Sequence, residues 1–274
     1  LLHSATMVTA GVYLAVRFWF VLVNFPVFQT LIMLFGLCTS FYSAIVLTTV
    51  NNAKHTTAYT TLNQLGFMFY SAGALCFATT LFHLFVHGFY KSFTFLENAI
   101  ELASLEDEQD AAVGFFNTSY FESFMDIFGF IVFISVNALP FSSPSVSKEL
   151  LVFTGLESFS TFVSFFLLST LFIGFMDSCY DDFSGDNSVF QSFGALGFLI
   201  SPFPIVFAYF TLGIAAFVVV FMCEELFLTI SIVFGDFYVF NLFSNGSFFL
   251  FIPFIFIIVS SIFFPARALF SSSN

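Results

Sequence analysis

The sequence predicts an all-α membrane protein: a polytopic transmembrane helix bundle of about seven to nine spans, with one helix broken near residues 140–148. Of the 274 residues, 59% are apolar and only 8% are charged, so the chain cannot supply the charged surface of a soluble domain of this size. Apolar runs of about 20 residues recur along the chain, and a helix of that length crosses a bilayer because it rises about 1.5 Å per residue.

The expected spans follow these apolar runs in order. They cover residues 1–23, 27–50, 56–78, 79–96, 120–140, 150–176, 194–222 and 247–264. A further stretch, 224–243, fits either a span or an interfacial helix, because Glu224, Glu225 and Asp236 bracket it.

The helix break is expected from Pro140 and Pro144, which fall where the span 120–140 would continue. Proline removes a backbone donor and interrupts the helical hydrogen-bond ladder. Broken backbone is tolerated within a membrane only where it is buried in protein or lines a polar cavity. Lys148 follows shortly afterwards, so the sequence places an ionisable group beside the break. The alternative is that Pro144 begins a helix in a loop, with Lys148 and Glu149 as interfacial charges.

Basic residues also stand inside an apolar run, where an ionisable group costs roughly 2.5–3.5 kcal/mol on insertion scales. His83, His87 and Lys91 are four residues apart in LFHLFVHGFYKSFTFL, so they share one helix face with a rise of about 6 Å per step. A neutral histidine can accept on one nitrogen and donate from the other, as a proton relay requires. The spacing therefore indicates a proton path. In the alternative interpretation Lys91 snorkels to the membrane interface and neighbouring groups satisfy the histidines.

Composition and motifs argue against several other classes of function. The net charge of −12 comes mostly from two acidic stretches, 97–110 and 177–186, which are expected to be solvated loops. The sequence has no basic patch that could bind nucleic acid. The four cysteines are far apart and have no ligand spacing, so neither a metal site nor a disulfide framework is indicated. Dinucleotide-binding, phosphate-loop, cluster-ligating and haem-ligating motifs are missing, so the chain is expected to bind no cofactor and no redox centre.

Several segments resemble one known family in both order and spacing. They are LLHSATMVTAGVYL at the start, AYTTLNQLG at 58–66, FHLFVHGFYKSFTFL at 82–96 and EDEQD at 106–110. They resemble the antiporter-like subunits of proton-pumping respiratory NADH:ubiquinone oxidoreductase (complex I), and within them the C-terminal half of subunit 5. The resemblance is dense over 1–110 and thins over 138–150, where ALPFSSPSVSKE stands against a family pattern of the type LPxxxGFxSKD.

The resemblance assigns proton-relay roles to a set of basic residues. They are His3 of the HxxTMVxAG-like helix, Lys54 before the AYTT segment, the His83–His87–Lys91 triplet, and Lys148 of the broken helix. The chain departs from the family pattern at His55, at Ala112 and at Glu149. Lys54 also fits a simple anchor near a helix start.

The resemblance further implies a proton-translocating membrane-arm subunit, which is a non-redox part of an oxidoreductase. NADH, FMN, iron–sulfur clusters and ubiquinone would belong to partner subunits. Residues 1–157 would form the antiporter-like half bundle with the polar axis, and 158–274 the C-terminal transmembrane helices. The expected partners are lipids, other membrane-arm subunits, and a companion chain with the N-terminal half of the same subunit, because LLHSATMVTAG lies mid-subunit in the family.

The expected location is the mitochondrial inner membrane, as a multi-pass protein, because 51 phenylalanines beside very few lysines are typical of organellar coding bias. Two other interpretations stay open. A subunit of a multisubunit cation/proton antiporter shares the opening motif and the His–His–Lys helix, although EDEQD favours the dehydrogenase. A purely structural membrane subunit with a degenerate polar axis is the alternative from a different class.

Overall fold

The computed structural model describes residues 2–50, 52–104, 135–138, 142, 144–148, 150–151, 167–174, 211, 213–215 and 218. The elements in this part of the chain are all helices, in agreement with the predicted all-α class. Their order is a π-helical segment η1 (Leu2–Met7), then α1 (Thr9–Arg17), α2 (Trp19–Asn24), α3 (Pro26–Leu47), α4 (Ala53–Gly73) and α5 (Phe77–Ser104).

Of the first predicted span, 1–23, the structure describes residues 2–23, and these are divided among η1, α1 and α2. The chain leaves helical geometry at Phe18, which has φ −93° and ψ 24°, and again at Phe25, which has φ −124° and ψ 81°. Phe25 precedes Pro26, whose ring disfavours helical geometry for the residue before it but suits the first turn of a helix. The Gln29 side chain closes this corner by donating to the carbonyl oxygen of Leu22 at 2.6 Å.

The next three predicted spans correspond to α3, α4 and α5, with boundaries that differ by a few residues at most ends. Among the described helices, α3 alone is both long and apolar enough to pass a membrane-span test by length and composition. Asn52 directly precedes α4, and its side-chain oxygen accepts from the backbone N–H groups of Lys54 at 3.1 Å and His55 at 3.4 Å. This is an N-cap, which satisfies donors that the first turn leaves unpaired.

α5 is longer than the predicted span 79–96 and runs from Phe77 to Ser104. The expectation that the acidic stretch 97–110 is a loop is therefore wrong for residues 97–104. Hydropathy marks where a helix leaves the apolar layer, but the backbone ladder can continue past that point because every hydrogen bond lies within the helix. Residues 105–110 lie outside the described residues.

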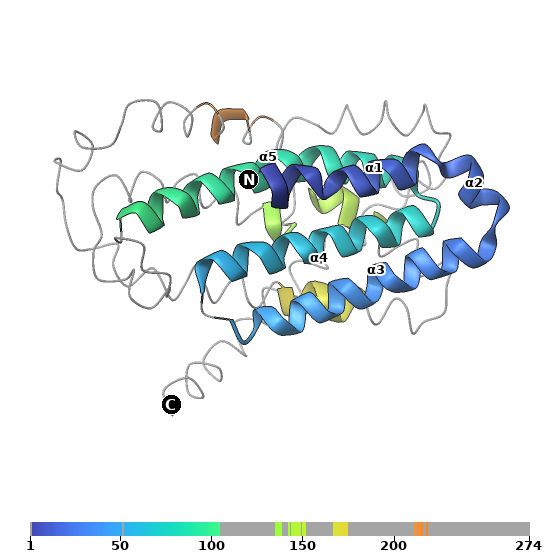
Figure 1. The fold of residues 1–274 in the computed structure, drawn as a ribbon, viewed down its shortest axis with the longest axis horizontal. Helices are drawn as coiled ribbons and strands as arrows, with labels where there is room; N and C mark the ends of the chain where they lie inside the picture. Colours follow the sequence, from blue (N-terminus) through green and yellow to red (C-terminus); the bar gives the residue numbers. More distant parts are fainter. Residues whose placement is uncertain are drawn as a thin grey trace.

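α4 lies between α3 and α5 and also contacts α1, so it is the central helix of the described part (Figure 1). α3 and α4 approach closely at Gly36 and Gly66. A Cβ atom on Gly36 would lie 2.5 Å from the backbone nitrogen of Tyr70, and one on Gly66 would lie 2.7 Å from Cβ of Ser40. Small residues at such contacts are typical of membrane helices, which associate by close packing rather than by a hydrophobic difference from lipid.

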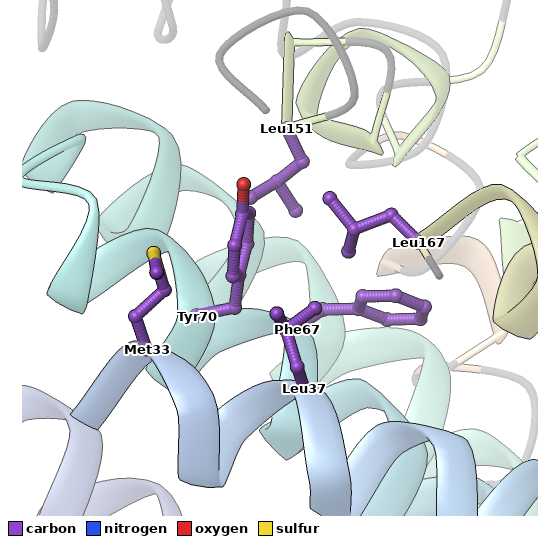
Figure 2. Packing of buried hydrophobic residues seen from close by; sticks show 6 residues of the cluster. All are labelled: Met33, Leu37, Phe67, Tyr70, Leu151 and Leu167. Carbon is purple, nitrogen blue, oxygen red and sulfur yellow. The ribbon is translucent and has the colours of Figure 1, made fainter. Parts of the chain in front are cut away.

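Two apolar clusters attach the later segments to these helices. The first, shown in Figure 2, comprises Met33, Leu37, Phe67, Tyr70, Leu151 and Leu167. The second comprises Phe82, Val86 and Tyr90 of α5 with Leu150. Residues 150 and 151 thus pack against α5 and α4 respectively, which holds the segment 144–148 beside both helices.

The predicted helix break is present. Residues 135–136 are helical, Asn137 and Ala138 form a turn, and residues 144–148 are helical again. Ala138 has φ 53°, a left-handed conformation that a right-handed helix cannot contain. Most of the predicted spans 120–140, 150–176 and 194–222, and all of 224–243 and 247–264, lie outside the described residues. The division at residue 157 stays a prediction.

Candidate functional site

The predicted basic triplet lies on the inner face of α5. His83, His87 and Lys91 are 1%, 0% and 1% exposed, and Lys148 from the segment after the break is 5% exposed. The His83 and His87 rings are stacked, with centroids 6.4 Å apart and an angle of 27° between their planes. Lys91 therefore does not snorkel to an exposed position. The spacing of four residues places all three side chains on one buried face of α5, as the sequence predicts.

His83 joins three elements of the structure. Its Nδ1 atom lies 2.8 Å from the hydroxyl of Ser147, in the segment after the helix break. Its Nε2 atom lies 3.2 Å from Oε1 of Gln64 on α4. Both ring nitrogens are thus paired with buried neutral groups, and the ring is held between α4 and the interrupted helix.

Lys91 is held by α4. Its ammonium group donates to the hydroxyl of Thr60, and that hydroxyl donates to the carbonyl oxygen of Thr57 at 3.0 Å. Thr57 lies about one turn before Thr60 on α4. Its hydroxyl accepts from the side-chain amide of Asn98 on α5 at 3.1 Å. A polar seam therefore runs between α4 and α5 from Lys91 to Asn98.

Lys148 is held at the break itself. Its ammonium group donates to the carbonyl oxygen of Val136, the last helical residue before the turn at Asn137. A broken helix leaves carbonyl oxygens without partners, and a lysine can satisfy one of them. This burial and this contact favour the predicted position beside the break over an interfacial charge.

His87 differs from His83 because neither of its ring nitrogens has a hydrogen-bond partner among the described residues. The same is true of the Tyr90 hydroxyl, and the rings of His87 and Tyr90 meet edge to face with centroids 5.4 Å apart. Buried polar atoms almost always have partners, and ordered water commonly supplies them. His87 and Tyr90 are therefore the two members of the cluster whose polar side-chain atoms lie buried without a partner among the described residues.

The other two predicted relay residues do not join this cluster. Lys54 is exposed in the first turn of α4, and His3 is exposed in η1. Within the described residues, no group of three or more His, Cys, Asp or Glu side chains is arranged to hold a metal ion.

Sequence reasoning missed the neutral partners of the cluster. They are Thr60, Gln64, Tyr90 and Ser147, all in regions that read as apolar spans or as a loop. One available signal was the recurrence of Thr57, Thr60 or Thr61, and Gln64 at helical spacing, which places a polar stripe on α4.

A family model described as NADH:quinone oxidoreductase/Mrp antiporter, transmembrane, matches residues 1–174, which include α1 to α5 and Lys148. NADH-ubiquinone oxidoreductase chain 5 of Chondrus crispus is 30% identical over 197 residues, which are 70% of this chain and 29% of that protein. NADH-quinone oxidoreductase subunit L of Rhodobacter capsulatus is 37% identical over 110 residues, which are 40% of this chain and 15% of that protein.

The structure of the Mrp complex from Dietzia sp. has the same fold, with a TM-score of 0.66 and 21% identity, over 97% of this chain and 30% of that one. The chain thus spans less than a third of the length of the relatives it matches, for example 29% of the Chondrus protein. The family match covers the buried His/Lys cluster and the helices that hold it. The chain therefore belongs to the NADH:quinone oxidoreductase/Mrp antiporter transmembrane family.

Proposed function

We propose that the chain is a proton-translocating membrane-arm subunit of an NADH:ubiquinone oxidoreductase, and that Lys91, His87, His83 and Lys148 form its proton relay. The observation that carries the proposal is the burial of two lysines and two histidines in one contiguous cluster. Ionisable groups are expensive in a membrane, and a buried set of them is by default attributed to an ion or proton path.

The partners of the two ammonium groups suit a relay. Lys91 donates to a threonine hydroxyl and Lys148 donates to a backbone carbonyl oxygen, so both are held by neutral oxygens. An ammonium held in this way can release its proton without breaking an ion pair, and lysine changes protonation state more readily than arginine when buried. Water around His87 would connect Lys91 with His83, because His87 has no direct partner among the described residues.

The redox chemistry that drives translocation belongs, in this proposal, to other subunits, which bind NADH, FMN, iron–sulfur clusters and ubiquinone. The names of the relatives support a dehydrogenase, and the organellar coding bias supports the mitochondrial inner membrane. Other membrane-arm subunits and lipids would cover the apolar side chains that α1 to α3 and η1 expose, such as Leu2, Phe28 and Phe35.

The proposal includes a companion chain that carries the earlier half of the same subunit. The exposed positions of His3 and Lys54 support it, because a relay role for either residue requires a neighbour that shields it from lipid. Identifying the protein that crosslinks to residues 2–24 in the assembled complex tests this part. We expect a crosslink to a companion chain that carries the motifs of the subunit's earlier half. A crosslink to an unrelated subunit, or no protein crosslink because lipid covers these residues, would contradict it.

A cation/proton antiporter is the second candidate, because the fold matches that of an Mrp complex. Affinity purification of the chain from its native membrane separates the two. Co-purification with flavin- and iron–sulfur-containing subunits is the expected result. Co-purification with other antiporter subunits and without redox subunits would favour the second candidate.

Replacing Lys91 tests the relay itself and separates it from a structural role. Lys91→Met is expected to reduce proton translocation by the assembled complex while leaving assembly largely intact. Arg17→Met, which removes a positive charge from an exposed position on α1, is the matched control and should retain translocation. Equal translocation by the Lys91 variant and the control would instead favour a purely structural membrane subunit with a degenerate polar axis.

A further inference from the structure

We propose that Gln64 and Ser147 are positioning residues for His83, and that Ser147 couples the protonation of His83 to the interrupted helix that carries Lys148. This inference rests on the proposed relay and adds two residues to it. Neither residue exchanges a proton with the solvent or carries a charge. Their role is to decide which nitrogen of His83 takes and gives the proton.

The contacts that carry the inference are short, buried and made by two different elements. Gln64 is 2% exposed and Ser147 is 0% exposed. Gln64 Oε1 lies 3.2 Å from Nε2 of His83, and Ser147 Oγ lies 2.8 Å from Nδ1. A solvent-shielded histidine with one neutral partner on each nitrogen cannot turn its ring without losing both contacts.

Gln64 selects the reactive nitrogen. Its Oε1 atom is an acceptor, so the His83 ring must carry a proton on Nε2 to make this bond. Nδ1 is then the nitrogen that is bare in the neutral ring and protonated in the charged ring. That nitrogen faces Ser147 in the segment 144–148. In the proposed relay it gains a proton through water on the His87 side and loses it towards Lys148, while the Ser147 hydroxyl keeps its own proton.

Ser147 responds to the charge on His83 because its hydroxyl has one proton and two acceptors. The hydroxyl lies 3.0 Å from the carbonyl oxygen of Pro144 and 2.8 Å from Nδ1 of His83. When Nδ1 is bare, the hydroxyl donates to the ring. When Nδ1 carries a proton, the ring donates to Ser147 Oγ and the hydroxyl turns to donate to Pro144.

This reorientation reaches the helix break. Pro144 is the first residue of the helical segment 144–148, and Lys148, in the same segment, donates across the break to Val136. A change in the bond to the Pro144 carbonyl therefore occurs within about one helical turn of the second lysine. The protonation of His83 on α5 is in this way linked to the segment that positions Lys148.

The chain offers a matched control for each residue. Ser145 is buried in the same segment and donates to the carbonyl oxygen of Ser142 at 2.7 Å, whereas His83 bonds to Ser147. Asn63 is the neighbour of Gln64 on α4, is buried, and also carries an amide. Replacing Ser145 or Asn63 removes the same chemical group without removing either of the two contacts to His83.

The experiment measures protons translocated per NADH oxidised by the assembled complex in vesicles, together with its assembly. Ser147→Ala and Gln64→Met are expected to cause at least about half of the loss that His83→Leu causes. Ser147→Thr, which keeps the hydroxyl, is expected to restore translocation. Ser145→Ala and Asn63→Leu are expected to translocate close to the level of the unmodified complex.

The outcomes separate this inference from the proposed function. If His83→Leu loses translocation while Ser147→Ala and Gln64→Met match their controls, the relay stands and the positioning role is wrong. The positioning role is also wrong if Ser147→Thr fails to restore what Ser147→Ala loses, or if only the Ser147 and Gln64 variants fail to assemble. Full translocation by both His83→Leu and Lys91→Met would overturn the relay and the inference together.

Discussion

Lys91 donates its hydrogen bond to Thr60 on the neighbouring helix α4, and not to His87 one turn away on its own helix. The Thr60 hydroxyl donates its own hydrogen bond to the carbonyl oxygen of Thr57, so the hydroxyl oxygen is free to accept from the Lys91 ammonium. The lysine is thereby held against α4, and the step between Lys91 and His87 depends on water or on movement of the lysine side chain.

Removing that acceptor is expected to destabilise the α4–α5 contact. Thr60→Val keeps the side-chain shape and leaves the buried ammonium of Lys91 without its partner, which costs about 1.5–3 kcal/mol for a bond to a charged group. Thermal inactivation of the assembled complex measures the effect. Thr61→Val is the control, because the Thr61 hydroxyl donates to backbone carbonyls of its own helix. Equal stability of the two variants would show that Lys91 does not depend on Thr60.

The close approach of α3 and α4 predicts that Gly66 tolerates no side chain. Gly66→Ala would bring a Cβ atom to 2.7 Å from the backbone nitrogen and Cβ of Ser40, and relief of this overlap requires the helices to separate. Overpacking of this kind typically costs about 1–3 kcal/mol. Gly88→Ala on α5 is the control, since nothing lies within 4 Å of the new atom. Assembly yield and thermal stability should fall for the first variant only, and a matching fall for Gly88→Ala would count against the packing argument.

The helix break predicts a preference for glycine at residue 138. Ala138 has φ 53°, which costs an alanine roughly 1–2 kcal/mol and costs glycine almost nothing. Ala138→Gly should therefore leave the stability of the complex unchanged or raise it slightly, whereas Ala138→Val should lower it. The comparison is made by thermal denaturation. A stabilising valine would mean that residue 138 belongs to a continuous helix.

Much of this fold could be predicted from apolar runs and local signals. α3, α4 and α5 lie close to the runs 27–50, 56–78 and 79–96, and the break near Pro140 and Pro144 is present. The division of the first span at Phe18 was not predicted, because phenylalanine itself does not interrupt a helix. The length of α5 was underestimated, because hydropathy reports the apolar layer and not the end of the helical ladder.

The candidate site could be predicted only for its charged members. Four-residue spacing placed His83, His87 and Lys91 together, and an ionisable group in an apolar run is costly enough to mark a functional position. Helical spacing places Thr60 and Gln64 on one polar stripe of α4 but does not give their partners on α5, and Ser147 has no such signal. Threonine and serine in helices commonly bond to their own backbone, so a role in pairing across helices depends on the register between helices, which local sequence does not encode.

The central claim is that Lys91 and Lys148 are two proton-binding groups on one proton path, and that His87 and His83 connect them. The most direct test compares proton translocation by assembled complexes carrying Lys91→Met, Lys148→Met or both substitutions. Residues that act in series are non-additive, so each single variant should lose translocation and the double variant should be no worse than the more severe single one. Losses that multiply in the double variant, or full translocation by either single variant, would contradict a single path through the cluster.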